Sequence, residues 1–477
     1  MSVPTCVLLI DALNPTMGLE SRFAGLGLAY LVASARRAFP DAGLQFRIAD
    51  RDVSAALDGF QPHLVGISST SQNFNCAIQY ADLAACRGIP VVVGGAHVTA
   101  LPSSLPRTAV GVLGEGEGTF VDLLWALLEG RFDRESWARI RGLAFWDETG
   151  LRQTEPRPMA KELDQIPMPA RDLLKVTSHA NMITSRGCPY RCAFCFSTRF
   201  WAKVRFFSPE YVVEEIAKLV RDYRVETITF YDDLFVANRR RVEEIATLLE
   251  HRGLAGRVKF TCYVRANLVN PALAKLLRRI GVVSVAMGLE SGDDEVLRFL
   301  KGGVTVEQNR QALVMLKAEG IATSGTFVIG SPRESREQIM RTYEFVRTSP
   351  LDLFDVFLLT PLPGTPIWQL AKERGLVADE MDWSRLEINP YRSLEKALVL
   401  SEVLTPGEVG RLYRKFRRLR ARRIARSALH HPLRRHFPAM AAKLVWGYLR
   451  GKLTARRAGP LPDRRLEPGR RVASTTR

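Results

Sequence analysis

Several features that would place this chain in a membrane or outside the cell are missing from its sequence. No apolar run approaches the roughly 18 residues needed to cross a bilayer. The first ten residues lack the basic segment and the cleavage site of a secretory signal. Cysteine is scarce, with 7 in 477 residues, and an odd, thinly spread set argues against a disulfide framework. We therefore expect a cytoplasmic protein, whose reducing surroundings suit a metal or redox site.

The net charge of +18 is concentrated at one end of the chain. Residues 411–477 carry 21 Lys and Arg against Asp463 and Glu467, which leaves residues 1–410 close to neutral. Within 406–430, apolar residues recur at helical spacing on a segment otherwise covered by arginine, which predicts a basic amphipathic helix. These apolar residues are Val409, Leu412, Phe416 and Leu419. A second apolar and aromatic stretch at 437–449 predicts another helix, followed by a Pro- and Arg-rich tail.

Three interpretations of this basic region, 386–477, stay open: a solvated helical face, a nucleic-acid contact, or attachment to anionic lipid headgroups. An apolar stripe beside arginine-rich faces is typical of a helix at a membrane interface. We therefore expect peripheral contact with the inner membrane face, which would suit a lipid-phase substrate. Nucleic acid is less well supported, because no RNA-binding module is recognisable and arginine runs alone are unspecific.

The first 145 residues alternate short apolar runs with helical patterns, which predicts a doubly wound parallel α/β sheet. Such sheets bind ligands beyond the carboxyl ends of their strands, where this sequence has small residues such as Gly94-Gly95 and Ser68-Ser-Thr70. These residues either admit a large planar ligand or only build turns. The five predicted strands are Cys6–Ile10, Leu44–Ala49, His63–Ile67, Val91–Val93 and Val110–Leu113.

A proline-containing linker is predicted at 146–178, followed by a second α/β unit at 179–385. Six repeats of strand and helix predict a partial (β/α)6 barrel. Its strands are expected at 181–185, 226–230, 257–262, 282–287, 322–329 and 353–359. Amphipathic helices are expected at 209–222, 239–252, 305–319 and 335–348.

Three cysteines follow the first strand of this barrel, in the segment Ser185-Arg-Gly-Cys188-Pro-Tyr-Arg-Cys192-Ala-Phe-Cys195. They fall in a loop at the carboxyl end of the strand, where barrels place their active sites. Three thiolates can ligate three irons of a cubane cluster and leave the fourth open, whereas a structural zinc site or an electron-carrying cluster needs a fourth ligand. His179 is a poor fourth ligand, because it precedes the strand.

The spacing Cys-x3-Cys-x2-Cys, with Phe194 before the last cysteine, resembles the signature of radical S-adenosylmethionine (SAM) enzymes. The resemblance implies that Cys188, Cys192 and Cys195 hold a 4Fe-4S cluster, and that one electron cleaves SAM at its open iron to a 5′-deoxyadenosyl radical. It extends through Phe230-Tyr-Asp-Asp233, Arg265, Gly288-Leu-Glu290-Ser-Gly292, Gly330-Ser-Pro-Arg-Glu334 and Pro361-Leu-Pro-Gly364-Thr-Pro366.

By the same resemblance, Phe194, Asp233, Arg265, Glu290 and Ser291 should lie beside SAM, with Arg265 able to pair with its carboxylate. Two simpler roles stay open for these residues. Glu290 could cap the helix that begins near Gly292, and Arg265 could form a surface ion pair.

The first unit resembles the Rossmann-like cobalamin-binding domain that precedes many radical SAM domains. The resemblance implies a set of cobalamin contacts at the strand ends: Asn14, Ser68, Thr70, Gly94, Gly95, Gly114 and Glu115. One departure stands out, because the loop Asp11-Ala-Leu-Asn14 lacks the histidine that ligates cobalt in cobalamin mutases. His97 is a poor substitute, since it follows the Gly-Gly turn. Cys6, Cys76 and Cys86 could form a second cluster, but core filling suits them better.

These resemblances imply a cobalamin-dependent radical SAM enzyme that methylates an unactivated carbon or phosphorus of a small biosynthetic intermediate. An external donor such as flavodoxin or ferredoxin would reduce the cluster. The alternative enzyme keeps the radical start but ends in cyclisation, rearrangement or oxidation, as in anaerobic porphyrin cyclases. A non-catalytic cobalamin or iron-sulfur binding protein is the alternative of another class.

Overall fold

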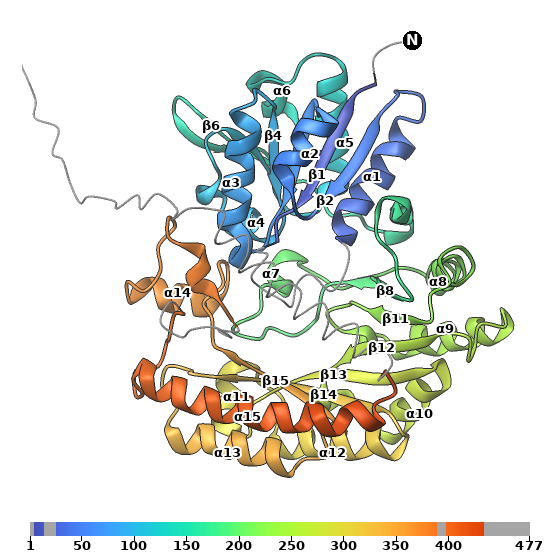
Figure 1. Ribbon diagram of the computed structural model, residues 1–477, viewed down its shortest axis with the longest axis vertical. Coiled ribbons are helices and arrows are strands. Elements are labelled where there is room, and N and C mark those ends of the chain that lie inside the picture. Colours follow the sequence, from blue (N-terminus) through green and yellow to red (C-terminus); the bar gives the residue numbers. More distant parts are fainter. Residues whose placement is uncertain (1–3, 14–24, 389–396, 434–477) are drawn as a thin grey trace, which may run out of the picture.

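The computed structural model describes residues 4–13, 25–388 and 397–433 as two α/β units, one above the other in Figure 1. The upper unit is a seven-stranded sheet of order β2-β1-β3-β4-β5-β6-β7. The pairings that join β1 through β5 are all parallel, as predicted, and β2 lies at the edge. The strands are β1 (Cys6–Asp11), β2 (Gln45–Ala49), β3 (Leu64–Ser68), β4 (Val91–Gly94), β5 (Ala109–Val112), β6 (Leu143–Asp147) and β7 (Gly150–Gln153).

Helices cover both faces of this sheet, which explains why its strands are continuous apolar runs. In β1, Leu8 and Ile10 face one core cluster, whereas Val7 and Leu9 face the other. The helices are α1 (Leu26–Ala38), α2 (Val53–Phe60), α3 (Phe74–Ala85), α4 (Ala96–Ala100), α5 (Gly116–Leu128) and α6 (Arg134–Arg139).

The first unit extends beyond residue 145, into the region expected to be linker. β6 and β7 form an antiparallel hairpin whose first strand pairs with β5. In its turn, the Asp147 carboxylate accepts a hydrogen bond of 2.8 Å from the backbone N–H of Thr149. The linker prediction was therefore wrong for 146–153, because it rested on prolines that all lie beyond this hairpin.

The lower unit is a six-stranded parallel sheet of order β15-β14-β13-β12-β11-β8 that does not close, which confirms the partial barrel. Its strands are β8 (His179–Met182), β11 (Thr227–Phe230), β12 (Lys259–Val264), β13 (Val282–Glu290), β14 (Ala322–Ile329) and β15 (Leu353–Leu358). Its helices are α8 (Pro209–Tyr223), α9 (Arg239–His251), α10 (Pro271–Ile280), α11 (Asp294–Leu300), α12 (Val306–Ala318) and α13 (Arg336–Thr348). A two-stranded ribbon of β9 (Ser185–Arg186) and β10 (Arg205–Phe206) and the short helix α7 (Ser197–Phe200) lie between the units (Figure 1).

The chain leaves the barrel after β15 and packs against the first unit. Helix α14 (Pro366–Glu373) and the short turn η8 (Trp383–Leu386) supply Trp368, Ala371 and Trp383 to a core cluster shared with the first sheet. The expected barrel region 179–385 therefore includes residues whose main contacts are with the other unit.

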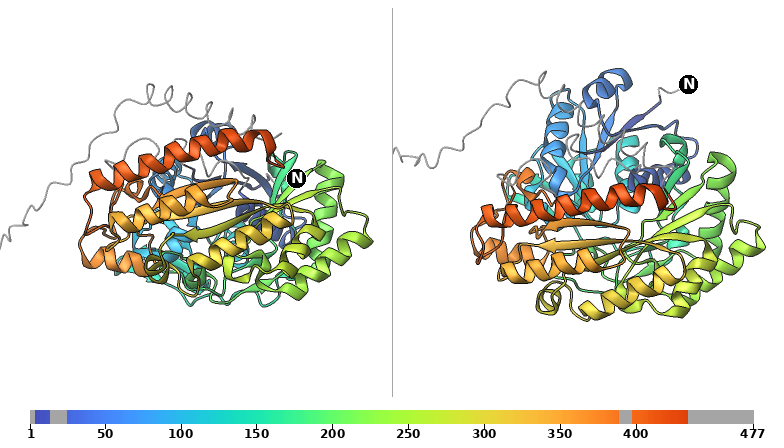
Figure 2. Two further views of the ribbon diagram at one scale, coloured as in Figure 1. Left: turned by 90° about the horizontal axis from the view of Figure 1, so that it is seen from below. Right: turned by 60° about the horizontal axis from the view of Figure 1, so that its bottom comes forward.

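Helix α15 (Pro406–His430) crosses beneath the barrel beside β15 and α13 (Figures 1 and 2). The helix was predicted, but its apolar stripe is not exposed: Val409, Leu412 and Phe416 are buried in the barrel core, and Leu419 packs against it. Arg420 adds an ion pair of 2.7 Å with Asp355. Lipid cannot reach this stripe, so the expected interfacial use of it was wrong. Residues 437–449 lie outside the described residues.

Among the described residues, no helix is both long and apolar enough to cross a membrane.

Candidate active site

The three cysteines lie in one loop between the ribbon strand β9 and helix α7, at the carboxyl end of the barrel strands. All three are partly buried. Within the loop, the backbone N–H of Cys195 donates to the carbonyl of Cys192. The N–H of Ala193 donates over 2.8 Å to the carbonyl of Leu300, which ties the loop to the end of α11. We call residues 188–195 the cluster loop.

Two adjacent aspartates after β11 hold both ends of the cluster loop. Asp232 is fully buried and accepts hydrogen bonds from the backbone and hydroxyl of Thr184 and from the hydroxyl of Ser185. Asp233 accepts a 2.6 Å hydrogen bond from the hydroxyl of Ser197, beyond the third cysteine. Burial raises the pKa of Asp233. Asp233 therefore anchors the loop, and its expected contact with SAM stays a prediction.

Arg265 lies directly beside the cluster loop and is not a surface residue. Its Nη1 is 3.6 Å from Cys192 Sγ, and its guanidinium lies over the ring of Tyr190 at 3.9 Å. Its Nη2 donates to the carbonyls of Lys301 and Gly302, and its Nε donates to Asn267. Most of its N–H groups thus donate to atoms of the protein. This arrangement fits a cation that faces the sulfur of Cys192 better than one that binds the carboxylate of SAM through two N–H groups.

Glu290 ends strand β13 in the left-handed conformation, at φ +59°, and its side chain is buried. A Cβ added to Gly288 would lie 2.1 Å from Glu290 Oε1, so the first glycine of the Gly-Leu-Glu motif makes room for this carboxylate. Glu290 does not cap the following helix, because the N-cap of α11 is Asp293.

Lys301 is the counter-charge of Glu290, and sequence reasoning missed it. Its Nζ lies 3.8 Å from Glu290 Oε1 and donates to the carbonyl of Gly288. Burial raises the pKa of Glu290, which Lys301 and Arg265 oppose, and burial lowers the pKa of Lys301. Two cations and one carboxylate therefore line the wall next to the cluster loop.

Ser291 and Phe194, the other expected SAM contacts, have protein partners. The Ser291 hydroxyl is fully buried and lies 3.0 Å from Thr342 Oγ1 of α13. Phe194 is partly buried and packs against the core cluster that joins the two units. Their contact with SAM stays a prediction.

The donor set of the cluster loop fits an iron–sulfur cluster. Burial raises the pKa of Cys188, and it raises the pKa of Cys195 to about 11. Iron must therefore displace their protons, and the nearby charges of Arg265 and Lys301 offset the negative charge of thiolates. A structural zinc site needs four ligands, and among the described residues no such group of His, Cys, Asp or Glu is formed around the cysteines. His179 Nε2 is instead 2.8 Å from Thr229 Oγ1, at the amino end of its strand.

At the carboxyl edge of the first sheet, Ser68 and Gly94 are neighbours in register, as expected for a shared ligand edge. Gly95 has φ +100°, and an added Cβ would lie 2.7 Å from the Ser69 carbonyl. Close packing of these two loops therefore accounts for Gly95. Ser68 and Gly94 are partly exposed and Thr70 is exposed, so these residues are open to a ligand such as cobalamin. Asn14 lies outside the described residues.

Gly114 and Glu115, predicted to bind cobalamin, serve the protein itself. The Gly114 N–H donates to Thr99 Oγ1 over 3.0 Å. Glu115 forms buried ion pairs with Arg186 and Arg205 of the ribbon, at 2.6 and 2.8 Å. Its second oxygen also accepts from the N–H of Ala160. The Glu115 carboxylate is thus fully engaged by the barrel unit and the linker, which argues against a cobalamin contact.

His97 is fully buried, with Nδ1 and Nε2 each 2.9 Å from a serine hydroxyl, those of Ser71 and Ser104. Burial lowers its pKa to about 3. Both ring nitrogens are engaged by serine hydroxyls, which leaves neither of them available to ligate cobalt in this structure. Cys6, Cys76 and Cys86 do not gather into a metal group within the described chain.

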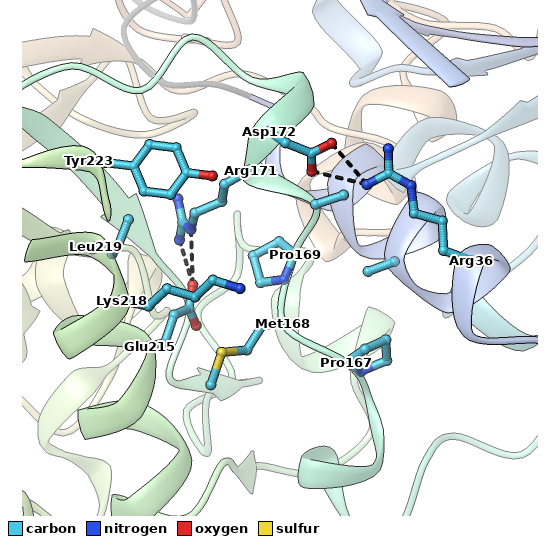
Figure 3. Close-up of a pocket in the computed structure, with 12 residues that line it drawn as sticks. Arg36, Pro167, Met168, Pro169, Arg171, Asp172, Glu215, Lys218, Leu219 and Tyr223 are labelled. Atoms are coloured by element: carbon cyan, nitrogen blue, oxygen red, sulfur yellow. Dashed lines mark hydrogen bonds and ion pairs between the residues drawn. The ribbon is translucent and has the colours of Figure 1, made fainter. Parts of the chain in front are cut away.

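A cavity of about 360 Å³ lies elsewhere, between α1, the linker and α8 (Figure 3). Its floor holds the buried ion pair of Arg171 and Glu215, at 2.6 Å, and its rim holds that of Arg36 and Asp172. No residue of the cluster loop lines this cavity. It is therefore separate from the candidate site.

Comparisons with known proteins agree with this geometry. The family model of the radical SAM superfamily matches residues 182–346, and that of the B12 binding domain matches residues 19–124. The uncharacterized methyltransferase PH0819 of Pyrococcus horikoshii is 32% identical over 425 residues, which cover 84% of this chain and 90% of the relative. The anaerobic magnesium-protoporphyrin IX monomethyl ester cyclase of Cereibacter sphaeroides is 29% identical, but the match covers 66% of this chain and 53% of the cyclase.

Among solved structures, the fold is similar to that of the cobalamin-dependent S-adenosylmethionine radical enzyme OxsB with aqua-cobalamin and S-adenosylmethionine bound. The TM-score is 0.65 at 17% identity, and the match covers 95% of this chain and 80% of OxsB. At this identity the likeness shows the fold alone.

Proposed function

Because the chain belongs to the cobalamin-dependent radical SAM enzymes, we propose that it transfers methyl groups from SAM to an unactivated carbon or phosphorus of a biosynthetic intermediate. When bound, the 4Fe-4S cluster supplies the electron that cleaves SAM, and cobalamin supplies a methyl carrier. The relative that covers most of this chain is itself described as a methyltransferase.

The observation that carries this function is the meeting of the two units at the cluster loop. Buried ion pairs join the loop at the carboxyl end of β5 in the first sheet to the ribbon strand that leads into Cys188. The cobalamin-binding unit therefore faces the barrel at its cysteine end. A methyl carrier held by the first unit would be close to SAM held by the second, as transfer requires.

The residues of the chain hold and orient the reactants. Cys188, Cys192 and Cys195 would hold the cluster, and Arg265 and Lys301 would balance its charge. The carboxylate of Glu290 is the group suited to the ammonium of the SAM amino acid part. The barrel and the first unit above it would shield the radical from side reactions with groups other than the substrate.

Anaerobic reconstitution tests the proposal. Protein loaded with iron, sulfide and cobalamin, and reduced in the presence of SAM, should form 5′-deoxyadenosine, and with its substrate should form S-adenosylhomocysteine and a methylated product. Cys188→Ala should abolish the 5′-deoxyadenosine, whereas Cys86→Ala, an exposed cysteine away from the site, should not. Equal yields from the wild type and Cys188→Ala would contradict the radical SAM function.

The competing outcome is cyclisation, rearrangement or oxidation of the substrate. The similarity to the cyclase of Cereibacter sphaeroides supports this alternative. A product without a new methyl group, formed by protein with a full complement of cobalamin, would favour it.

We also propose an external one-electron donor such as flavodoxin or ferredoxin. Apart from the cluster loop, the described residues contain no grouped cysteines that could hold a relay cluster. Replacing dithionite by reduced flavodoxin should sustain 5′-deoxyadenosine formation. No turnover with either physiological donor would count against this proposal.

For the basic region we propose purely electrostatic contact with an anionic membrane, where a lipid-phase substrate would be found. Arg414, Arg418, Arg422 and Arg426 form an exposed row at helical spacing on α15, and each basic residue near an anionic surface contributes about 1 kcal/mol. Vesicles of anionic lipid should float the protein at low salt, and glutamine at these four positions should weaken flotation. If the variant floated as well as the wild type, the contact would belong to another part of the chain. If neither protein floated, membrane contact would be excluded.

A further inference from the structure

The chain segments that enter and leave the cluster loop contact each other directly. Gly187, just before Cys188, has φ +95°, and an added Cβ would lie 2.8 Å from the carbonyl of Lys203. Next to this contact, Arg186 of β9 pairs directly opposite Arg205 of β10. The loop that carries the cysteines is therefore closed at its base by this two-stranded ribbon.

Two arginines opposite each other in a ribbon repel, so this pairing needs anions. The first unit supplies them. Glu115 contacts both arginines, and Glu117 Oε1 lies 2.5 Å from Arg186 Nη2. Both glutamates stand at the start of α5, and the side chain of Glu115 makes no cap to its own helix. We call Glu115, Glu117, Arg186 and Arg205 the interdomain clamp.

The clamp is largely buried, and its most exposed side chain is Glu117, at 16%. The side chains of Arg186, Arg205 and Glu115 are 6%, 4% and 8% exposed. Arg186 also lies between two rings, Tyr30 of α1 at 5.4 Å and Trp201, just after α7, at 5.5 Å. Burial opposes the charge of Arg186, but Glu117 and Glu115 outweigh it and raise its pKa. Buried ion pairs add little net stability over apolar packing, whereas they do set registry.

We propose that Arg186 is a positioning residue that fixes the cluster loop against the cobalamin-binding unit, and so sets the placement of SAM relative to the methyl carrier. This inference rests on the proposed function. The guanidinium fork reaches Glu115 with one nitrogen and Glu117 with the other, and a lysine ammonium, with its donors on one nitrogen, does not reproduce this fixed planar geometry. Loss of that fork would let the two units shift while each still holds its own cofactor.

The test compares Arg186→Lys with Arg171→Lys in the full-length chain. Both arginines are buried and pair with a buried glutamate at 2.6 Å, but Arg171 binds Glu215 of α8 and touches neither the cluster loop nor the first sheet's glutamates. Both substitutions keep the charge, so each variant should fold. Any general loss of stability should be similar in the two.

In the protein without cofactors, Arg186→Lys should speed hydrogen exchange in peptides covering 187–204 and 113–118, and Arg171→Lys should not. In the loaded protein, single-turnover formation of S-adenosylhomocysteine should fall by up to about 10²-fold for Arg186→Lys, the scale expected for a displacement of about 1 Å. Formation of 5′-deoxyadenosine, which needs only the cluster and SAM, should change by no more than about twofold. Glu117→Gln should share this pattern in weaker form.

The inference would be overturned if Arg186→Lys changed the hydrogen-exchange rates and the ratio of S-adenosylhomocysteine to 5′-deoxyadenosine no more than Arg171→Lys does. The clamp would then only stabilise the contact between the two units. A parallel fall of both products would also overturn the inference, because the cluster itself would then be impaired. Wild-type protein that makes neither product would instead contradict the proposed function, and the exchange measurement would still decide whether Arg186 holds the loop.

Discussion

Replacing Lys301 by methionine should destabilise the protein in a way that depends on pH. Lys301 is the close cation for Glu290, at 3.8 Å, and both side chains are less than one-tenth exposed. At an effective dielectric constant of about 20, a unit charge pair at this distance is worth ~4 kcal/mol. Methionine fills similar volume, so the main loss is the counter-charge of a buried carboxylate.

Protonation of Glu290 limits that loss. Without Lys301 its folded pKa rises further above the ordinary value of 4.5, so the folded protein binds a proton that the unfolded chain releases. A folded group that stays protonated costs 1.36 kcal/mol per pH unit above the pKa of the unfolded chain, which sets an upper limit of about 2.7 kcal/mol on the change between pH 5 and pH 7. Burial also raises the pKa of Glu290 in the wild type, so the deficit of Lys301→Met should be larger at pH 7 than at pH 5 by less than this limit.

Guanidinium unfolding of the cluster-free protein, followed by circular dichroism at both pH values, measures this deficit. Lys317→Met is the matched control, because Lys317 pairs with Asp352 at 3.0 Å but is half exposed, and its loss should stay below about 1 kcal/mol at either pH. The double variant Glu290→Gln/Lys301→Met should lose the pH dependence. A deficit of Lys301→Met that is equal at pH 5 and pH 7 would refute the reasoning.

Three further predictions concern single residues. Burial raises the pKa of Glu334 to about 7, so wild-type stability falls as pH rises from 4.5, and Glu334→Gln should gain about 3 kcal/mol on the wild type between pH 5 and pH 8 in unfolding midpoints. His97 has a pKa of about 3, so it lowers the free energy of unfolding as pH falls below 6.5. From pH 7 to pH 5, His97→Asn should therefore lose about 2 kcal/mol less of this free energy than the wild type. An equal loss in the two proteins would contradict the burial of His97 as a neutral ring. Gly187→Ala should lower the iron bound per chain after reconstitution, whereas Gly43→Ala, also at positive φ but in open space, should not.

Much of the barrel could be predicted from sequence because its elements are local. All six expected strands and the four expected helices are present, with ends that differ by a few residues. Continuous apolar runs and capping residues such as Ser208 and Thr305 act within a few positions of one another. The hairpin of β6 and β7 was missed because its strands are short and one of them, β7, is largely polar.

Helix α15 also shows what a local sequence pattern cannot predict. Helical spacing correctly placed Val409, Leu412 and Phe416 on one side, but an apolar stripe does not say what covers it. A membrane and the barrel satisfy the same pattern, and only the packed structure shows that β15 and α13 cover it.

The sequence by itself pointed to the chemistry, through three cysteines at the spacing typical of radical SAM enzymes on a loop at the carboxyl end of a barrel strand. The tertiary structure alone decided which charges surround them. Glu115 meets Arg186 across 71 positions and Arg205 across 90, and Lys301 meets Glu290 because helix α11 brings the chain back to the end of β13. Ion pairs form between side chains within a few ångströms of each other. A local pattern of residues does not indicate which distant charge the fold places next to the cluster loop.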